Sequence, residues 1–397
     1  MAEAYIVAAA RVAGGKRNGK LSGWHPADLA ASVLDALIAR TGCDPALVED
    51  VIMGCVGQAG EQATNIARNA VLASKLPESV PATSVDRQCG SSQQALHFAA
   101  QAVMSGSMDI VIAAGVESMS RVPMGMPSTL PAKNGLGFYV SPNMQARYPG
   151  VQFSQFIGAE MLVKKYGLTR DELDAFALQS HQRAIAATRG GAFTQEIVPV
   201  AVRMNDGTET GELHTADEGI RYDASIESIA SVKLLQEGGA LTAASASQIC
   251  DGSAGLMVVN ERGLKALGVA PLARVHHMSV LGHDPVIMLE APIPATERAL
   301  KRAGMKIDDI DLFEVNEAFA SVVLAWKAEM GLDDETFDAK VNVNGGAIAL
   351  GHPLGASGTK LLATLVNELE RTGGRYGLQT MCEGGGLANA AIIERLG

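Results

Sequence analysis

Two distant segments of the chain follow the same order: a turn of small residues, a helix and a short apolar strand. The first is QCGSSQQALHFAAQAVMSGSMDIVIAAG (88–115), and the second is GHPLGASGTKLLATLVNELERTGGRYGLQTMCEGG (351–385). Strands that alternate with helices indicate an α/β fold in which short apolar strands are buried in a sheet. The repeat predicts two related halves whose corresponding turns face one another.

Apolar runs and helical spacing place further elements along the chain. DIVIAAG (109–115), IDLFEV (310–315) and GLQTMC (377–382) predict short buried strands. Leucine and valine at helical spacing predict a helix over 25–42 that stops at a glycine, and Thr169 is placed to cap another helix. The alternation of the two patterns supports an α/β architecture.

The middle of the chain interrupts this alternation. Residues 121–150 are rich in proline, glycine, methionine and asparagine and show no clear period, and residues 201–242 are mixed and polar. Loops of this length in compact proteins usually serve a site or an interface. We therefore interpret 121–242 as an insertion between two sheet-forming portions.

Charge and cysteine content exclude several classes of protein. The formal net charge of −11 and the lack of a lysine or arginine cluster argue against a nucleic-acid surface. Five cysteines, an odd number without a CxxC pair or a His/Cys cluster, argue against a disulfide scaffold and a metal site and favour a reducing compartment. The first residues lack a membrane span and a signal peptide, so we expect a cytoplasmic protein with no membrane partner.

Cys89 stands between a polar approach and the first of the two repeated helices. The unpaired N–H groups and the macrodipole of a helix N-terminus favour an anion, so we expect a thiol there to ionise readily and to be a good nucleophile. Gly90 leaves the backbone open to close approach by a ligand or by another segment. The alternative is a buried cysteine that acts as a small apolar residue.

His352 stands in NGGAIALGHPLGASGTK, where glycines impose sharp turns and close packing. The order Gly358-Thr359-Lys360 does not match a phosphate-binding P-loop. Pro353 suits a first helical position, which predicts that His352 lies at a helix cap. A histidine held there suits a base or a hydrogen-bond donor, and the alternative is a residue that only caps the helix.

Two more side chains follow predicted strands, where ligands gather in open α/β sheets. Cys382 ends one strand and enters CEGGGLANAA, whose glycine N–H groups suit an oxyanion hole for a ligand oxygen. Asn316 follows IDLFEV, and its alternative role is the N-cap of the helix predicted over EAFASVVLAWKAEMG.

Taken together, these segments resemble the thiolase family. The matching segments are CGS at Cys89, NEAF (316–319), GHP (351–353), CEG (382–384), GVESMS (115–120) and NGGAIALGHPLGASG (344–358). The resemblance covers essentially the whole chain. Ser92 stands where a glycine is common, and GGGLANAA lacks a glycine often found after the triple glycine, but neither departure removes a reacting group.

The resemblance implies the thiolase fold, in which two related βαβαβαββ halves form a layered αβαβα arrangement with an inserted loop domain. By this likeness the N-terminal half covers 1–120 and is completed by 243–270, the loop domain covers the active site with 121–242, and the C-terminal half covers 271–397. The family also implies coenzyme A as co-substrate, no permanently bound cofactor, and a homodimer or homotetramer.

Carried to the matching residues, the family's chemistry implies an acyltransferase that cleaves a 3-ketoacyl-CoA with CoA, or runs the reverse Claisen condensation. Cys89 is expected to become acylated after activation by His352. Cys382 is expected to exchange protons with the α-carbon and with the incoming CoA. Asn316 is expected to hold a water that binds the enolate oxygen together with His352, and the N–H groups of Cys89 and Gly384 are expected to form an oxyanion hole.

Coenzyme A contacts and acyl preference are implied more loosely. Ser247 matches the family's pantetheine-contacting serine, and Arg221 aligns with a residue near the nucleotide. Residues 154–155 read Ser-Gln where short-chain biosynthetic thiolases carry a His-Met pair, so the chain looks closer to degradative thiolases of fatty-acid and steroid side-chain breakdown. We expect a preference for medium or bulky acyl groups, and the alternative is that a phenylalanine of VQFSQF fills the space.

Three other functions stay open at this point. The first is a short-chain acetoacetyl-CoA thiolase that works in the biosynthetic direction. The second is a ketoacyl synthase, which would carry a histidine or asparagine in place of Cys382. The third is a thiolase-like protein that only binds acyl chains; such a protein should have lost a reacting group, and none is lost here.

Overall fold

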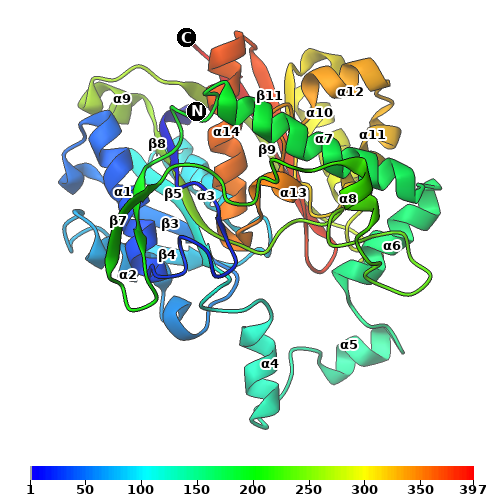
Figure 1. Ribbon diagram of the computed structural model, residues 1–397. Coiled ribbons are helices and arrows are strands. Elements are labelled where there is room, and N and C mark those ends of the chain that lie inside the picture. Colours follow the sequence, from blue (N-terminus) through cyan, green and yellow to red (C-terminus); the bar gives the residue numbers. More distant parts are fainter. Residues whose placement is uncertain (1) are drawn as a thin grey trace.

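A mixed sheet of ten strands runs through the computed structural model, which describes residues 2–397 (Figure 1). Nine strands follow the order β10-β11-β12-β9-β1-β8-β5-β3-β4, β2 pairs with β8 beside them, and β6 and β7 form a separate pair. The strands are β1 (Tyr5–Arg11), β2 (Gly15–Lys16), β3 (Asp50–Gly54), β4 (Ala82–Val85), β5 (Ile110–Ser118), β6 (Val200–Arg203), β7 (Glu209–His214), β8 (Cys250–Val259), β9 (Ala273–Gly282), β10 (Leu312–Val315), β11 (Tyr376–Glu383) and β12 (Leu387–Arg395).

Helices flank this sheet and fill the connections between its strands. The α-helices are α1 (Pro26–Thr41), α2 (Ile66–Ala73), α3 (Ser91–Ser105), α4 (Met126–Lys133), α5 (Pro142–Arg147), α6 (Gln155–Tyr166), α7 (Arg170–Arg189), α8 (Ile226–Ala230), α9 (Glu261–Leu267), α10 (Pro292–Ala303), α11 (Ala320–Met330), α12 (Asp334–Lys340), α13 (Ala347–Leu350) and α14 (Ser357–Thr372). Short 3₁₀ turns are η1 (Pro45–Leu47), η2 (Gly60–Gln62), η3 (Ile307–Asp309) and η4 (Leu354–Ala356).

The sheet repeats one pattern on either side of its centre. From β1 outward, β8 and β5 follow in antiparallel pairings and β3 pairs with β5 in parallel. From β9 outward, β12 and β11 follow in antiparallel pairings and β10 pairs with β11 in parallel. The sheet therefore consists of two related halves, joined by the antiparallel contact of β1 with β9. This arrangement confirms the mixed α/β fold that the sequence predicts.

The two repeated helices meet at their N-terminal ends. A β-carbon added at Gly358 of α14 would lie only 2.2 Å from the backbone nitrogen of Gln93 in α3, so the helices touch where only a glycine fits. The N–H of Thr359 also donates to Oγ of Ser92 at 3.0 Å. The turns before α3 and α14 therefore lie next to each other, as the repeat predicts.

The local patterns predicted most of these elements. The three apolar runs correspond to β5, β10 and β11, and the first helix ends at Gly42, whose φ of +62° is left-handed. Thr169 caps α7 through a capping box with Glu172. These elements are encoded locally, because their apolar spacing and their caps lie within a few residues of one another.

The segment 121–150 extends from the body of the protein and carries the short helices α4 and α5 (Figure 1). Neither helix buries a residue, and α4 contains Pro131. The boundaries of the two halves and of the loop domain stay predictions. Among the helices described within 2–397, none is both long and apolar enough to cross a membrane.

Candidate active site

The turn between β4 and α3 presents Cys89 from a strained backbone. The preceding residue, Gln88, has a φ of +49°, which few residues other than glycine adopt. Ser91 stabilises the turn, since its Oγ accepts from the N–H of Arg87 at 2.9 Å and donates to the carbonyl of Gln88. Cys89 is half-buried, whereas the other four cysteines are buried. The turn thus offers the thiol at the mouth of α3.

The resting thiol of Cys89 is protonated, which corrects the expectation of an easily ionised cysteine. Burial of the sulfur raises its pKa to about 12, and the charges of Glu383, Glu117 and Asp86 act in the same direction. Its own backbone N–H lowers the pKa but does not offset these effects. The helix end is therefore not sufficient to form a thiolate, and a base must remove the proton during the reaction.

His352 is fixed at a defined orientation and is not a cap, contrary to the prediction. Pro353 precedes the turn η4, and α14 begins only at Ser357. The N–H of His352 donates to the carbonyl of Gln248 at 3.0 Å, and the Nδ1 atom contacts Oγ of Ser357. The hydroxyl of Ser357 donates to the carbonyl of Pro353 at 3.0 Å, so its oxygen accepts from Nδ1–H of the imidazole. That assignment leaves Nε2 as the basic nitrogen.

Burial keeps the imidazole of His352 neutral. It lowers the pKa of His352 to about 3, and the nearby ammonium of Lys360 acts in the same direction. A neutral ring whose Nε2 carries a lone pair is the form that accepts a proton. His352 therefore suits the base that the protonated Cys89 requires.

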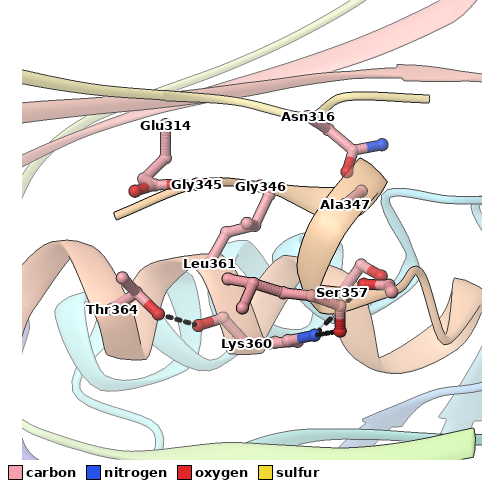
Figure 2. Close-up of a pocket in the computed structure, with 11 residues that line it drawn as sticks. Glu314, Asn316, Gly345, Gly346, Ala347, Ser357, Lys360, Leu361 and Thr364 are labelled. Atoms are coloured by element: carbon pink, nitrogen blue, oxygen red, sulfur yellow. Dashed lines mark hydrogen bonds between the residues drawn. The ribbon is translucent and has the colours of Figure 1, made fainter. Parts of the chain in front are cut away.

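Asn316 lies beside this base at the end of β10. Its Nδ2 is 3.5 Å from Nε2 of His352, and its backbone N–H donates to the carbonyl of Thr380 at 3.1 Å. Figure 2 shows Asn316 at the end of its strand and Ser357 at the start of α14, with α13 between them. Helix α11 begins at Ala320, with Phe319 at the N-cap, so the alternative that Asn316 caps this helix is wrong.

The amide oxygen of Asn316 is buried without a hydrogen-bond partner among residues 2–397. A buried polar atom of this kind is usually satisfied by a water or a ligand. The amide of Asn316 therefore fits a residue that binds a water or a substrate oxygen next to His352.

Cys382 lies in β11, one residue before its end, opposite Ala388 of β12. The side chain is fully buried, and burial raises the pKa of its thiol well above the usual value. The charges of Cys89 and Glu383 raise it further, which places Cys382 within electrostatic reach of Cys89. The structure thus brings the two cysteines into one site, both as thiols.

The glycine turn after Cys382 packs against the turn that carries Cys89. A β-carbon at Gly384 would lie 2.9 Å from Oε1 of Gln88, and one at Gly90 would lie 1.9 Å from Oε1 of Glu383. The space beside Gly90 is therefore occupied by the carboxyl group of Glu383. Glu383 is a further residue of this site that no local sequence pattern indicates: it is buried, and burial raises its pKa to about 8.

The two predicted CoA contacts differ in their placement. Ser247 is half-buried, and its N–H donates to the carbonyl of Ala318 at 2.9 Å, next to the loop that carries Asn316. Arg221 is exposed, and its backbone N–H donates to Nδ1 of His181 at 3.3 Å. No hydrogen bond of the described chain joins Arg221 to the cysteines, the histidine or the asparagine of the site.

Acidification is expected to destabilise the protein through its buried histidines. Burial lowers the pKa of His97 and His352 to about 3 and that of His181 to about 4. A group whose pKa is depressed by folding stabilises the protein above its unfolded pKa and loses that contribution as the pH falls. Between pH 7 and pH 5 we expect the free energy of unfolding to fall by about 2 kcal/mol for each of the three.

Urea unfolding at pH 7 and pH 5 measures this loss. His97 lies in α3 outside the reacting groups, so the variant His97→Gln should show a smaller loss than the wild-type protein between the two pH values. Equal losses in the two proteins would contradict a buried neutral His97.

Known protein families and individual proteins match this chain over most of its length. The family described as "Thiolase, N-terminal domain" matches residues 4–262, and "Thiolase, C-terminal domain" matches residues 269–395. A steroid 3-ketoacyl-CoA thiolase of Mycobacterium tuberculosis is 52% identical over 100% of this chain and 95% of its own. A 3-ketoacyl-CoA thiolase of Aliivibrio fischeri is 44% identical over 96% of both chains.

A solved structure gives the same result for the fold. The crystal structure of the Bacillus anthracis acetyl-CoA acetyltransferase superimposes with a TM-score of 0.89 at 36% sequence identity, covering 100% of this chain and 99% of the other. The likeness therefore extends over the whole chain.

Proposed function

This chain belongs to the thiolase family, and from that premise we propose that it cleaves 3-ketoacyl-CoA thioesters with free CoA, through an acyl group carried on Cys89. The protein is an acyltransferase, and CoA is its co-substrate. The observation that carries the proposed residue roles is the contact between the turns before α3 and α14, which brings the loop of a neutral His352 next to the turn that carries a protonated Cys89.

In the first half-reaction, Sγ of Cys89 attacks the 3-keto carbon while its proton passes to Nε2 of His352. The bond between the α-carbon and the 3-keto carbon then breaks, and the α-carbon takes the proton of the Cys382 thiol. Acetyl-CoA leaves, the shortened acyl group stays on Cys89, and Cys382 stays as a thiolate. Each group therefore starts in the protonation state that the structure gives it.

In the second half-reaction, the Cys382 thiolate takes the proton of the incoming CoA thiol. The CoA thiolate attacks the acyl carbon, Cys89 leaves, and the proton on His352 returns to its sulfur. The N–H groups of Cys89 and Gly384 are proposed to bind the tetrahedral oxyanion, and one such donor is worth roughly 3–4 kcal/mol of barrier. A water on Asn316 is proposed to help His352 bind the enolate oxygen, which would satisfy the unpartnered amide oxygen.

A thiolysis assay tests the proposal and separates the alternatives. Loss of 3-ketoacyl-CoA absorbance that requires free CoA is the expected result. A ketoacyl synthase forms 3-ketoacyl thioesters and would leave the substrate intact with or without CoA, and an acyl-binding protein would shift ligand spectra without turnover. Absence of CoA-dependent loss with every 3-ketoacyl-CoA tried would contradict the proposed function.

We expect a higher kcat/KM for medium-chain or ring-bearing 3-ketoacyl-CoAs than for acetoacetyl-CoA. The sequence has no His-Met pair at 154–155 to close the acyl pocket, and each extra buried methylene adds roughly 0.8 kcal/mol of binding. Phe156 packs edge-on against Phe319, beside the loop of Asn316, with ring centroids 5.7 Å apart. A ring at this place suits one wall of the acyl pocket.

Steady-state kinetics with three substrates checks this prediction: acetoacetyl-CoA, a medium-chain thioester and a ring-bearing one. Phe156→Ala is expected to change the ratio of kcat/KM between them, whereas Leu72→Ala should leave the ratio unchanged, because Leu72 lies on α2, outside 121–242, and is 58% exposed. A clear preference of the wild-type enzyme for acetoacetyl-CoA would contradict the prediction and favour the short-chain, biosynthetic alternative.

Three further features belong to this proposal. Ser247 is proposed to contact the pantetheine arm, since its N–H bond to Ala318 holds it beside the site. The segment 121–242 is proposed to cover the site, and the active form is proposed to be a homodimer or homotetramer. Five unpaired thiols, two of them in the site, support a role in a reducing compartment such as the cytoplasm.

A further inference from the structure

A buried ammonium group lies directly behind the loop that carries His352. Lys360 of α14 is only 4% exposed, and lysine is rarely buried unless it is paired. Its Nζ donates to the carbonyl of Leu350 at 2.6 Å and to that of Gly351 at 3.1 Å. Figure 2 shows the side chain running along α14 toward Ser357, with both bonds at its tip. The two acceptors are the residues immediately before His352.

A network of buried charges keeps this ammonium in place. Asp217 lies 3.8 Å from Nζ of Lys360, and it also accepts from the N–H of Gly14 at 2.7 Å and from the guanidinium of Arg11 at 2.9 and 3.0 Å. Arg11 in turn pairs with Glu196, which accepts from Oγ1 of Thr364 on α14. Two cations thus face two carboxyl groups, and the network links the start of the chain to α14.

The loop that Lys360 holds has a backbone that only glycine permits. Gly351 has a φ of +81°, and a β-carbon there would lie 2.6 Å from Sγ of the buried Cys250. Glycine has a permissive backbone, so the hydrogen bond from Lys360 helps to fix the orientation of the Gly351 carbonyl. On the other side of the loop, His352 is held by Gln248 and Ser357.

We infer that Lys360 is a positioning residue for His352: it holds the carbonyl groups of Leu350 and Gly351 and thereby fixes the direction in which Nε2 points into the site. The inference rests on the proposed function, because it concerns the base of that reaction. A displacement of about 1 Å in a reacting group can cost roughly 10²-fold in rate. The ammonium also lies close enough to help keep the imidazole neutral, together with burial.

Lys360→Met tests this role, because methionine fills most of the lysine volume but offers no donor and no charge. We expect kcat to fall by about 10²-fold with KM within about threefold, since the loss concerns the base and not substrate binding. The matched control is Lys340→Met: Lys340 also donates to a carbonyl, that of Ile310 at 2.8 Å, near the opposite end of β10. That variant should keep the wild-type kcat.

A folded Lys360→Met protein with a kcat within threefold of wild type, or with a raised KM alone, would overturn the inference. If this variant does not unfold cooperatively, Lys360→Gln takes its place: the amide keeps a donor without the charge, and about a tenfold loss of kcat is expected. A wild-type kcat in the folded glutamine variant would also overturn it.

A readout without turnover separates this inference from the proposed function. In histidine-labelled protein, the ring signals of His352, assigned with His352→Gln, should shift in the Lys360 variant, and the ring should take up a proton at higher pH than in the wild type. Unchanged ring signals and titration would contradict the positioning role even if thiolysis is confirmed. If the wild-type protein shows no thiolysis but the ring signals of His352 still shift in the Lys360 variant, the positioning role is supported and the proposed reaction is rejected.

Discussion

Cys89→Ser is expected to reduce CoA-dependent thiolysis by about 10⁴-fold or more, to the background of the assay. The nucleophile must lose its proton to His352, and a hydroxyl is far less acidic and less nucleophilic than a thiol. The structure makes this step demanding already for sulfur, because burial raises the pKa of Cys89 to about 12. Steady-state thiolysis of a 3-ketoacyl-CoA with saturating CoA measures the loss.

Cys43→Ser is the matched control for this variant. Cys43 is buried and packs in a core cluster with residues of α1 and β3. Its replacement should lower the thermal midpoint slightly and leave kcat near the wild-type value. Comparable loss of activity in both variants would show that the effect of Cys89→Ser is structural, and retained activity in Cys89→Ser would exclude Cys89 as the nucleophile.

Cys382→Ser is expected to slow turnover by about 10²- to 10⁴-fold while Cys89 still takes up an acyl group. Cys382 must give a proton to the α-carbon and then accept one from CoA, and near neutral pH a serine hydroxyl does neither efficiently. The fully buried position of Cys382, beside the turn that carries Gly384, suits a proton carrier that stays shielded from water.

Two rates measured on the same protein check the role of Cys382. Steady-state thiolysis should fall, whereas rapid-quench incorporation of acyl groups from a labelled 3-ketoacyl-CoA should remain detectable within minutes. Turnover within a few-fold of the wild-type enzyme would contradict a general acid and base role for Cys382.

The residues proposed to react can be selected from local sequence, because each stands next to a helix start, a strand end or a glycine-rich loop. Cys89 precedes a helix after a polar turn, and Cys382 lies near the end of an apolar strand before three glycines. His352 stands among glycines, and two of them, Gly345 and Gly351, have the positive φ values of a tight loop. Such features depend on neighbours within a few residues, so one sequence is enough to select them.

The protonation states could not be predicted in this way. The pKa of Cys89 depends on burial and on Glu383, a residue almost three hundred positions away that fills the space beside Gly90. A helix N-terminus alone would lower the pKa of Cys89, but desolvation outweighs that effect and raises it. Likewise, Asn316 looked like an N-cap until the structure placed the start of α11 at Ala320.

Residues that act through others were missed for the same physical reason. Ser357 sets the tautomer of His352, and Lys360 holds the loop before it, yet neither stands in a recognisable local pattern. Lys360 drew attention in the sequence only because its order with Gly358 excludes a P-loop. These contacts form only when α14 packs against the loop before His352, and the spacing of apolar residues in the sequence does not predict that packing.

The central claim is that the acyl group passes through Cys89. The most direct measurement is peptide mass spectrometry of wild-type enzyme mixed with a 3-ketoacyl-CoA, without free CoA, and quenched in acid within seconds. We predict a mass increase equal to the shortened acyl group on the peptide that contains Cys89, which disappears when CoA is added before the quench. An acyl group on Cys382, or none on an enzyme that turns over with CoA, would contradict the account.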